Sequence, residues 1–495
     1  MLFNSYEFIF GFLPITLALY YLLGLLGLPR PALIWLTGAS FFFYGWWNPS
    51  YLLLLFASIL FNFGVGVLLT RAARQGSPLR HTLLAFGVTG NLALLGYYKY
   101  AAFFVSNLGA ISGFEFQIQA VVLPLGISFY TFTQVAYLVD ATRGEAEDYN
   151  LISYCLFVTF FPHLIAGPII HHRQVMPQFA RSGTFRFSHV NFATGITFFA
   201  VGLFKKVVCA DTMGTFASPV FAAAADGVEL SAVRAWTGVL AFTLQIYFDF
   251  SGYSDMAVGL ARLFGITLPY NFNSPYKAVN IIDFWRRWHM SLSRFLRDYL
   301  YIPLGGNRRG ETRRYMNLFL TMLLGGLWHG AGWTLVAWGA LHGFYLLVNH
   351  AWHSLRARLG FPVVSQGTLW GRSLARLLTL LSVILGWVLF RAESMDTAFN
   401  LLSSMGGNHG IWVPRDLEPA MIEPLGVGVL EQGSLIICLL ALAGFGPNSQ
   451  ESIDGAQPSR LIWRFSALQA SIVATLLLFS ISRLSQVSEF LYFDF

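Results

Sequence analysis

The sequence predicts an all-α, polytopic integral membrane protein. Hydrophobic residues make up 56% of the 495 residues and charged residues only 11%, less than half the usual share in soluble domains. Apolar segments of about 20 residues, the length that crosses a bilayer as a helix, recur along almost the whole chain. We count about eleven to thirteen of them, with further interfacial and re-entrant segments, and expect one membrane-embedded domain over residues 1–495.

The predicted segments of the N-terminal half follow one another with short connections. They are residues 8–28, 32–47, 51–70, 82–98, 101–111, 121–139 and 151–170. The segment 101–111 is too short to span and is a candidate re-entrant segment. Pro162 and Pro168 predict a broken or kinked helix in the segment 151–170. Residues 140–149 are predicted to form an acidic polar loop.

The C-terminal half continues the pattern with longer polar interruptions. Its predicted membrane segments are residues 193–208, 233–250, 315–327, 336–350, 377–389, 425–445 and 468–481. Asp249 and Asp255 interrupt an apolar context at the end of the segment 233–250. Residues 392–423 are polar and are expected to form an insertion outside the membrane.

The positive charge is best explained by membrane topology. The net charge of +7 arises largely from basic loops, which membrane proteins hold on the cytoplasmic side, so it gives no indication of nucleic-acid binding. We expect the N-terminus outside and the loops 71–81, 307–314 and 356–376 inside. The three cysteines lie far apart in sequence and have no metal-binding or disulfide spacing, so buried free thiols are expected. No metal site is predicted.

Residues 280–343 carry the most unusual pattern in the chain. At about 100° per residue, residues 280–299 form a strongly amphipathic helix, basic on one face and aromatic on the other, which suits a membrane interface. His289 falls on the apolar side of that helix. It is either a buried histidine whose ring nitrogens are satisfied by neighbours or a functional group.

His329 lies in an apolar segment that glycines interrupt. Four glycines surround Trp328 and His329, at positions 325, 326, 330 and 332. Irregular backbone at membrane depth is tolerated only where it is buried in protein or lines a cavity. His329 is therefore a candidate for a neutral histidine at a cavity wall that can accept a proton, the alternative being a histidine hydrogen-bonded between helices.

Six sequence blocks occur in an order that is characteristic of one family. They are LPLGISFYTFTQVAYLVD, FFPHLIAGPI, QIYFDFSGYSDMAVG, FWRRWHMSLSRFLRDYLYIPLGGN, NLFLTMLLGGLWHGAGW and GWVLFRAE. Together they resemble the membrane-bound O-acyltransferase superfamily and, within it, the bacterial alginate O-acetyltransferase (AlgI-like) branch. The core motifs lie within residues 121–342.

The resemblance implies a ring or funnel of membrane helices and an acyl transfer activity. It implies acetyl-CoA as a cytoplasmic donor with no bound cofactor, and a bacterial inner-membrane location. The acceptor would be an exported polysaccharide, alginate first and cellulose or a similar polymer second, or a periplasmic partner protein that passes acetyl on. His329 corresponds to the family's active-site histidine and His289 to its second characteristic histidine.

Further site residues are expected around the two histidines. Trp328 and Trp333 would shape a narrow cavity that excludes water. Arg286, Arg287, Arg308 and Arg309 either contact CoA phosphates or anchor the chain at the cytoplasmic face. Asp249 either belongs to the site or pairs with an arginine to hold helices together. His342 either faces the same cavity or forms structural hydrogen bonds.

Three alternatives to polysaccharide acetylation remain open from the sequence. The first is another acyl transfer within the superfamily, such as D-alanylation of teichoic acid or acetylation of peptidoglycan. The second is a transporter or a flippase for lipid-linked sugars, since broken helices with intramembrane polar residues suit those proteins too. The third is a scaffold that only docks a periplasmic transferase.

Overall fold

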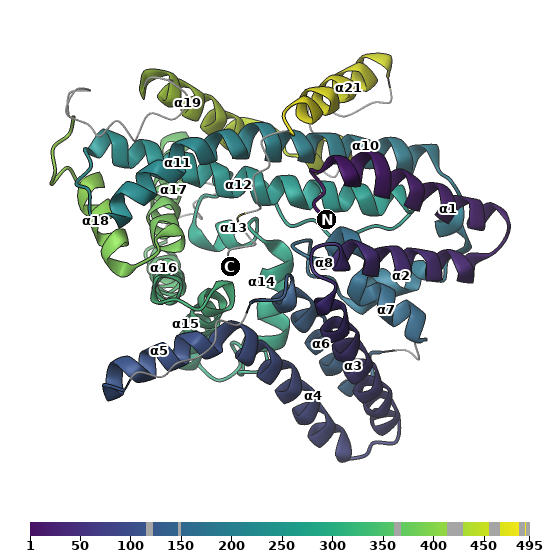
Figure 1. Cartoon of the computed structure of the whole chain (residues 1–495). Helices are drawn as coiled ribbons and strands as arrows, with labels where there is room; N and C mark the ends of the chain where they lie inside the picture. Colours follow the sequence, from purple (N-terminus) through teal and green to yellow (C-terminus); the bar gives the residue numbers. More distant parts are fainter. Residues whose placement is uncertain are drawn as a thin grey trace. The chain divides into compact units, whose positions relative to one another are not determined.

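The computed structural model describes the chain except residues 115–121, 147–149, 361–367, 413–428, 455–465, 485–490 and 492–495. The described residues form helices joined by short connections and contain no strand, which confirms the all-α class (Figure 1). They divide into two compact units, each built from segments far apart in the sequence. The first unit comprises Met1–Leu203, Tyr253–Tyr270 and Arg464–Val487, and the second comprises Phe204–Gly252, Asn271–Trp463 and Ser488–Phe495.

The first unit contains the N-terminal helices. Its elements are η1 (Glu7–Phe12), α1 (Leu13–Leu25), α2 (Pro29–Gly45), α3 (Ser50–Arg74), α4 (Leu79–Leu95), η2 (Gly96–Tyr100), α5 (Ala101–Ser112), α6 (Ile127–Thr142), α7 (Leu151–Thr159), α8 (Phe161–Leu164), α9 (His172–Phe179), η3 (Ser182–Phe185), α10 (His189–Phe204) and α21 (Ala467–Ser482).

The second unit contains the helices around the two candidate histidines. Its elements are η4 (Lys205–Ala210), α11 (Asp211–Ala225), α12 (Ala232–Leu263, of which residues 253–263 belong to the first unit), η5 (Pro275–Lys277), α13 (Ile281–Trp285), α14 (Met290–Leu296), η6 (Arg297–Tyr301), α15 (Glu311–His329), α16 (Trp333–Arg358), α17 (Leu369–Arg391), α18 (Met395–Met405), α19 (Val429–Phe445) and α20 (Ser449–Ile453).

Four described helical segments are long and apolar enough to cross a membrane. They are Glu7–Leu25, Ser50–Arg74, His189–Ala225 and Leu369–Arg391. This is fewer than the count of apolar segments in the sequence, because several of those segments form shorter helices. α2 and α4 have 17 residues each. That corresponds to about 26 Å of helix, against a hydrocarbon core of about 30 Å.

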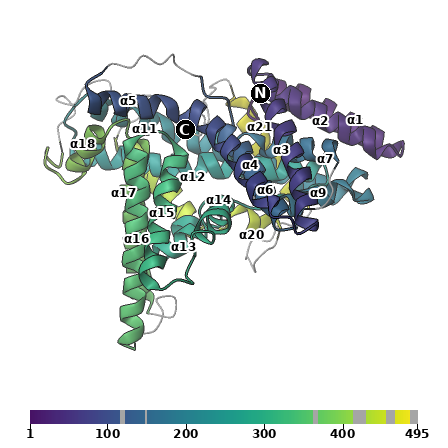
Figure 2. The same ribbon diagram turned by 90° about the horizontal axis from the view of Figure 1, so that it is seen from below.

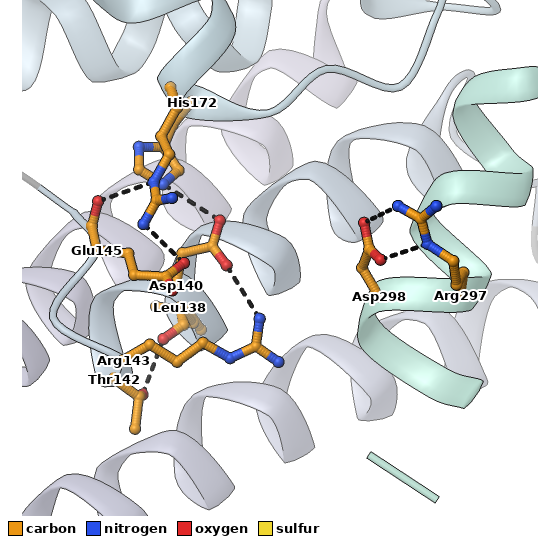
Figure 3. Close-up of polar contacts among 9 residues, drawn as sticks. Leu138, Asp140, Thr142, Arg143, Glu145, His172, Arg297 and Asp298 are labelled. Carbon is orange, nitrogen blue, oxygen red and sulfur yellow. Dashed lines mark hydrogen bonds and ion pairs between the residues drawn. The ribbon is translucent and has the colours of Figure 1, made fainter. Parts of the chain in front are cut away.

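The predicted break in the segment 151–170 is confirmed, whereas the acidic loop begins later than expected. α7 ends at Thr159 and α8 covers four residues, Phe161–Leu164. Asp140, expected in the loop, lies in α6 with its side chain buried, because it pairs with the buried His172 of α9 at 3.2 Å (Figure 3). A partner within hydrogen-bonding distance offsets the cost of burying a carboxylate.

α12 is longer than the predicted segment 233–250 and carries Asp249 in its interior. Asp249 is 2% exposed and lies 2.7 Å from the ammonium of Lys206, which also pairs with Asp211 at 2.9 Å. Lys206 comes from η4, which joins α10 to α11 without a break in the helical chain. These ion pairs allow a carboxylate to remain inside an apolar helix, so the aspartate does not end the helix there.

Helices α15, α16 and α17 pack side by side (Figure 2). Glycines permit the close approach of the first two: a Cβ built on Gly326 would lie 2.3 Å from the carbonyl oxygen of Leu335, and one on Gly339 would lie 2.5 Å from that of Met322. Small residues at such crossings are typical of helices in membranes. The predicted polar insertion begins with α18, whose Ala398 and Leu401 are buried, and residues 413–423 of it lie outside the described part of the chain.

Candidate active site

His289 lies at a break between two short helices, which corrects the prediction of one continuous amphipathic helix over residues 280–299. α13 ends at Trp285 and α14 begins at Met290. His289 has φ 41° and ψ 54°, the left-handed conformation that side chains other than glycine rarely adopt. A backbone held in a sparsely populated region costs about 1–3 kcal/mol and persists only where the surroundings impose it. The break turns the His289 side chain into the protein interior.

The surroundings that hold His289 in place include a buried asparagine. The Met290 backbone N–H donates to the carbonyl oxygen of Asn271, and the Asn271 side chain accepts a hydrogen bond of 2.6 Å from the Ser291 hydroxyl. On the other side of the break, the Trp288 backbone N–H donates to the carbonyl oxygen of Phe284. The peptide group between His289 and Met290 and the backbone N–H of Trp288 are therefore fixed.

His329 is the last residue of α15. Gly330 follows in an extended conformation, and only three residues separate His329 from Trp333, where α16 begins. A helix end leaves backbone groups without helical partners, so this short connection is the irregular backbone that the glycine pattern predicted. The contact of Gly326 with α16, one turn before His329, sets the position of this helix end.

The structure brings the two histidines together. The ring centroids of His289 and His329 are 6.5 Å apart, and both side chains are buried, with 0% and 3% of their surface exposed. His289 packs edge-on against Phe250 at 4.7 Å. His329 contacts Trp338 and Phe390, each at 5.2 Å between centroids. The pair thus lies in an aromatic shell that excludes water.

Burial decides the protonation state of His289. This residue lies between helices that are too short to span a bilayer, and desolvation lowers the pKa of its imidazole below the ordinary value of 6.5. A lowered pKa keeps the ring neutral at physiological pH. A neutral imidazole has one nitrogen that donates and one that accepts a hydrogen bond, which is the form that acid–base chemistry needs.

Of the other predicted site residues, Trp328 and His342 join this cluster and Trp333 does not. Trp328 lies 6.2 Å from His289 between ring centroids. The ring of His342 packs at a tilt against Trp338, 4.8 Å away between centroids, and its Nδ1 accepts a hydrogen bond of 3.3 Å from Trp285 Nε1. Trp333, in contrast, is 58% exposed, because the first turn of α16 faces outward at that position.

The four predicted arginines have different surroundings. Arg287 pairs with Asp283 at 2.8 Å and donates to the carbonyl oxygen of Asn273, so it supports the loop that precedes α13. Arg286, Arg308 and Arg309 have exposed side chains. Those three are accessible to a charged ligand.

Asp249 does not contact the histidines itself but precedes a residue that does. Its carboxylate pairs with Lys206, and the next residue, Phe250, contacts His289. The structural alternative that we stated for Asp249 therefore agrees with the geometry, although its partner is a lysine and not an arginine. Sequence reasoning missed Phe250, Trp338 and Phe390 as neighbours of the histidines. The block GWVLFRAE, which contains Phe390, was the available signal.

Comparisons with known proteins agree with this geometry. Residues 76–378, which include both histidines, match the MBOAT, membrane-bound O-acyltransferase, family. The chain is 41% identical to a probable alginate O-acetylase AlgI of Pseudomonas putida, over 100% of both chains. It is 43% identical to a peptidoglycan O-acetyltransferase of Helicobacter pylori, over 83% of this chain and 81% of that protein.

A more distant relative has a different acyl group in its name. The chain is 28% identical to a teichoic acid D-alanyltransferase of Streptococcus thermophilus, over 56% of this chain and 70% of that protein. The family match over more than half of the chain and the relatives above 40% identity lead to one conclusion. This chain belongs to the membrane-bound O-acyltransferase family and is a multi-pass membrane O-acyltransferase.

Proposed function

We propose that this protein takes an acetyl group from acetyl-CoA on the cytoplasmic side of the bacterial inner membrane and delivers it for O-acetylation of an exported polysaccharide. The observation that carries the proposal is the pair of buried imidazoles, His289 and His329, 6.5 Å apart within an aromatic shell. Acyl transfer from a thioester competes with hydrolysis, so a site that excludes water favours transfer to a hydroxyl.

His329 is the general base in this proposal. A ring nitrogen of its neutral imidazole takes the proton of the acceptor hydroxyl as the oxygen attacks the thioester carbonyl. The tetrahedral intermediate collapses, the carbon–sulfur bond breaks, and the imidazolium returns the proton to the departing thiolate. General base catalysis of this kind contributes typically about 10² to 10⁴ in rate.

His289 acts on the carbonyl oxygen or orients His329. Its strained backbone fixes the direction of the ring, and a lowered pKa keeps that ring neutral. A neutral imidazole N–H aimed at the developing oxyanion stabilises charge without reorganising, which is the kind of electrostatic contribution that is largest in many enzymes.

We assign binding of the acyl donor to the basic loop that precedes α15. Arg308 and Arg309 are exposed in the loop before α15, the helix that ends at His329. Arginine suits the phosphates of CoA because its guanidinium donates two hydrogen bonds in one plane. The cytoplasmic placement of this loop follows from the preference of basic loops for that side.

The acceptor is proposed from the relatives. Alginate is the first choice because relatives named as probable alginate O-acetylases match this chain at about 40% identity over its full length. Peptidoglycan is the second candidate, since a relative named as a peptidoglycan O-acetyltransferase is 43% identical over most of the chain. Transfer to the polymer proceeds directly or through a periplasmic partner protein.

The test is acetyl transfer by the purified full-length protein with labelled acetyl-CoA. Alginate, cellulose and peptidoglycan fragments are compared as acceptors, with and without a periplasmic extract of the source cells to supply a partner. We expect His329→Ala to lower transfer by at least about 10²-fold. The matched control is His81→Ala, which removes an exposed histidine. Full transfer by His329→Ala would refute the assignment of the base, and transfer of no acetyl to any acceptor in either condition would refute the proposed reaction.

A further inference from the structure

A cavity of about 280 Å³ lies between α16, α17 and the segment before α13. Neither His289 nor His329 lines it, although its lining residue Tyr345 contacts His342, and the lining mixes polar and apolar side chains. Asn349 and His353 of α16 and Thr379 and Ser382 of α17 supply the polar groups, and Val348 and Leu378 are among the apolar ones. A cavity with few converging polar groups on an apolar lining is typical of a site for a small amphipathic molecule.

The polar groups of this cavity are not equally available. The hydroxyls of Thr379 and Ser382 donate to the carbonyl oxygens of their own helix, at 2.7 and 2.8 Å. The side-chain oxygen of Asn349 is buried and accepts no hydrogen bond from the described residues. A buried acceptor without a donor is unfavourable. A ligand here would therefore gain from presenting an N–H or O–H group.

A second buried group without a partner lies one turn away. Arg372 is on the same face of α17 as Ala375 and Thr379, because helix residues three or four apart are neighbours. Its Nε is buried and donates to no group in the described part of the chain. An anion is the natural partner of a guanidinium N–H.

The electrostatic surroundings also favour an anion. Partial burial lowers the pKa of Lys277, and the positive charges of Arg287 and Arg376 lower it further, whereas Glu451 opposes them. Lys277 lies two residues before Val279, which lines the cavity. Three cations, Lys277, Arg287 and Arg376, thus lie around this side of the cavity with two carboxylates, Glu451 and the Asp283 that pairs with Arg287, so the net charge is positive by one.

The position of the cavity points to the bilayer as the source of the ligand. The cavity lies near the end of the unit at which α16 ends and α17 begins. Trp352 and the arginines at positions 356, 358, 372 and 376 lie there. Tryptophan and basic residues are typical of a membrane interface. Val348, Trp352 and Leu378 line the cavity and are 51%, 49% and 56% exposed, so its apolar wall continues onto the outer surface. Basic pockets between membrane helices on the cytoplasmic side are typical sites for lipid headgroups.

We propose that this cavity binds one phospholipid of the bilayer, with its phosphate at Arg372, a hydrogen-bond donor of its headgroup at the Asn349 oxygen, and an acyl chain along Val348 and Leu378. Phosphatidylethanolamine offers an N–H donor and phosphatidylglycerol offers O–H donors. Phosphatidylcholine has the same phosphate but no donor, so the site discriminates against it. The lipid joins α16 to α17, the helices that carry Trp338 and Phe390 to His329.

The test is native mass spectrometry of the purified full-length protein titrated with these three lipids, with identical acyl chains. We expect phosphatidylethanolamine and phosphatidylglycerol to bind about tenfold more tightly than phosphatidylcholine, since only the first two donate a hydrogen bond to the buried Asn349 oxygen. Asn349→Leu should remove the preference. Arg372→Gln should weaken the binding of all three lipids about tenfold, because it removes one charge-assisted hydrogen bond to the phosphate.

Two further variants separate the proposal from a folding defect. Asn349→Asp keeps the size of the side chain and should favour phosphatidylethanolamine, whose ammonium pairs with the carboxylate, over phosphatidylglycerol. Arg358→Gln is the matched control for Arg372→Gln, because it removes an exposed positive charge at the end of α16 and should leave lipid binding unchanged. Equal binding of the three lipids by the unaltered protein would overturn the proposal. Displacement of the bound lipid by free CoA would also overturn it, because the cavity would then belong to the acyl donor.

Discussion

Replacement of Gly326 by alanine should damage the proposed active site without touching a histidine. A Cβ at this position would lie 2.3 Å from the Leu335 carbonyl oxygen, whereas ordinary contact begins at 3.4 Å. The obstacle is backbone, so α15 and α16 must separate by about 1 Å, at a cost of about 1–3 kcal/mol for overpacking. His329 follows three residues later, and a displacement of about 1 Å at a reacting group costs about 10²-fold in rate.

Gly325 provides the matched control, since it is the neighbouring residue on the same helix. A Cβ there would meet only the end of the Leu296 side chain, at 3.3 Å, and that side chain can move. Alanine also favours a helix over glycine by about 1 kcal/mol. We therefore expect Gly325→Ala to keep its acetyl transfer within a few-fold and its melting temperature unchanged or slightly higher. Acetyl transfer and thermal unfolding in detergent measure both variants. Equal activity of Gly325→Ala and Gly326→Ala would refute the argument that this helix crossing positions His329.

Three further predictions concern buried polar groups. Lys206→Met should destabilise the protein by about 3–5 kcal/mol, because it removes the cation that pairs with the carboxylates of Asp211 and Asp249. Adding Asp249→Asn should recover part of this loss in a thermal unfolding assay. An unchanged melting temperature in Lys206→Met would contradict this prediction. His289→Asn should be more stable than His289→Val by about 1 kcal/mol or more, since asparagine tolerates positive φ and valine does not; the reverse order in chemical denaturation would count against strain at this residue. Burial lowers the pKa of His289, so below about pH 6.5 the unfolded chain binds a proton that the folded chain does not. The free energy of unfolding should therefore fall as pH decreases from 6.5, by at most about 1.4 kcal/mol per pH unit from this group. The pH dependence of the melting temperature should be shallower in His289→Asn, and identical slopes would exclude this contribution.

The sequence alone determined the class of the protein and singled out His289 and His329 as candidates. Composition and the recurrence of apolar segments indicate a helical membrane protein because burial in lipid demands both, wherever the helices lie. Glycines around His329 and the aromatic residues around His289 marked the two positions that later proved to be neighbours. Ordered blocks with these residues were sufficient to identify the family.

Only the tertiary structure decided which residues surround the histidines. Helical periodicity predicts one helix over residues 280–299, because a pattern of side chains cannot show that the backbone adopts a left-handed conformation at His289. The helix continues through Asp249 because Lys206, 43 positions earlier, neutralises it, and local propensity contains no information about a partner so far away. Phe250, Trp338 and Phe390 come from three different helices. Their meeting at one imidazole pair depends on how those helices pack, which the order of residues along the chain does not specify by itself.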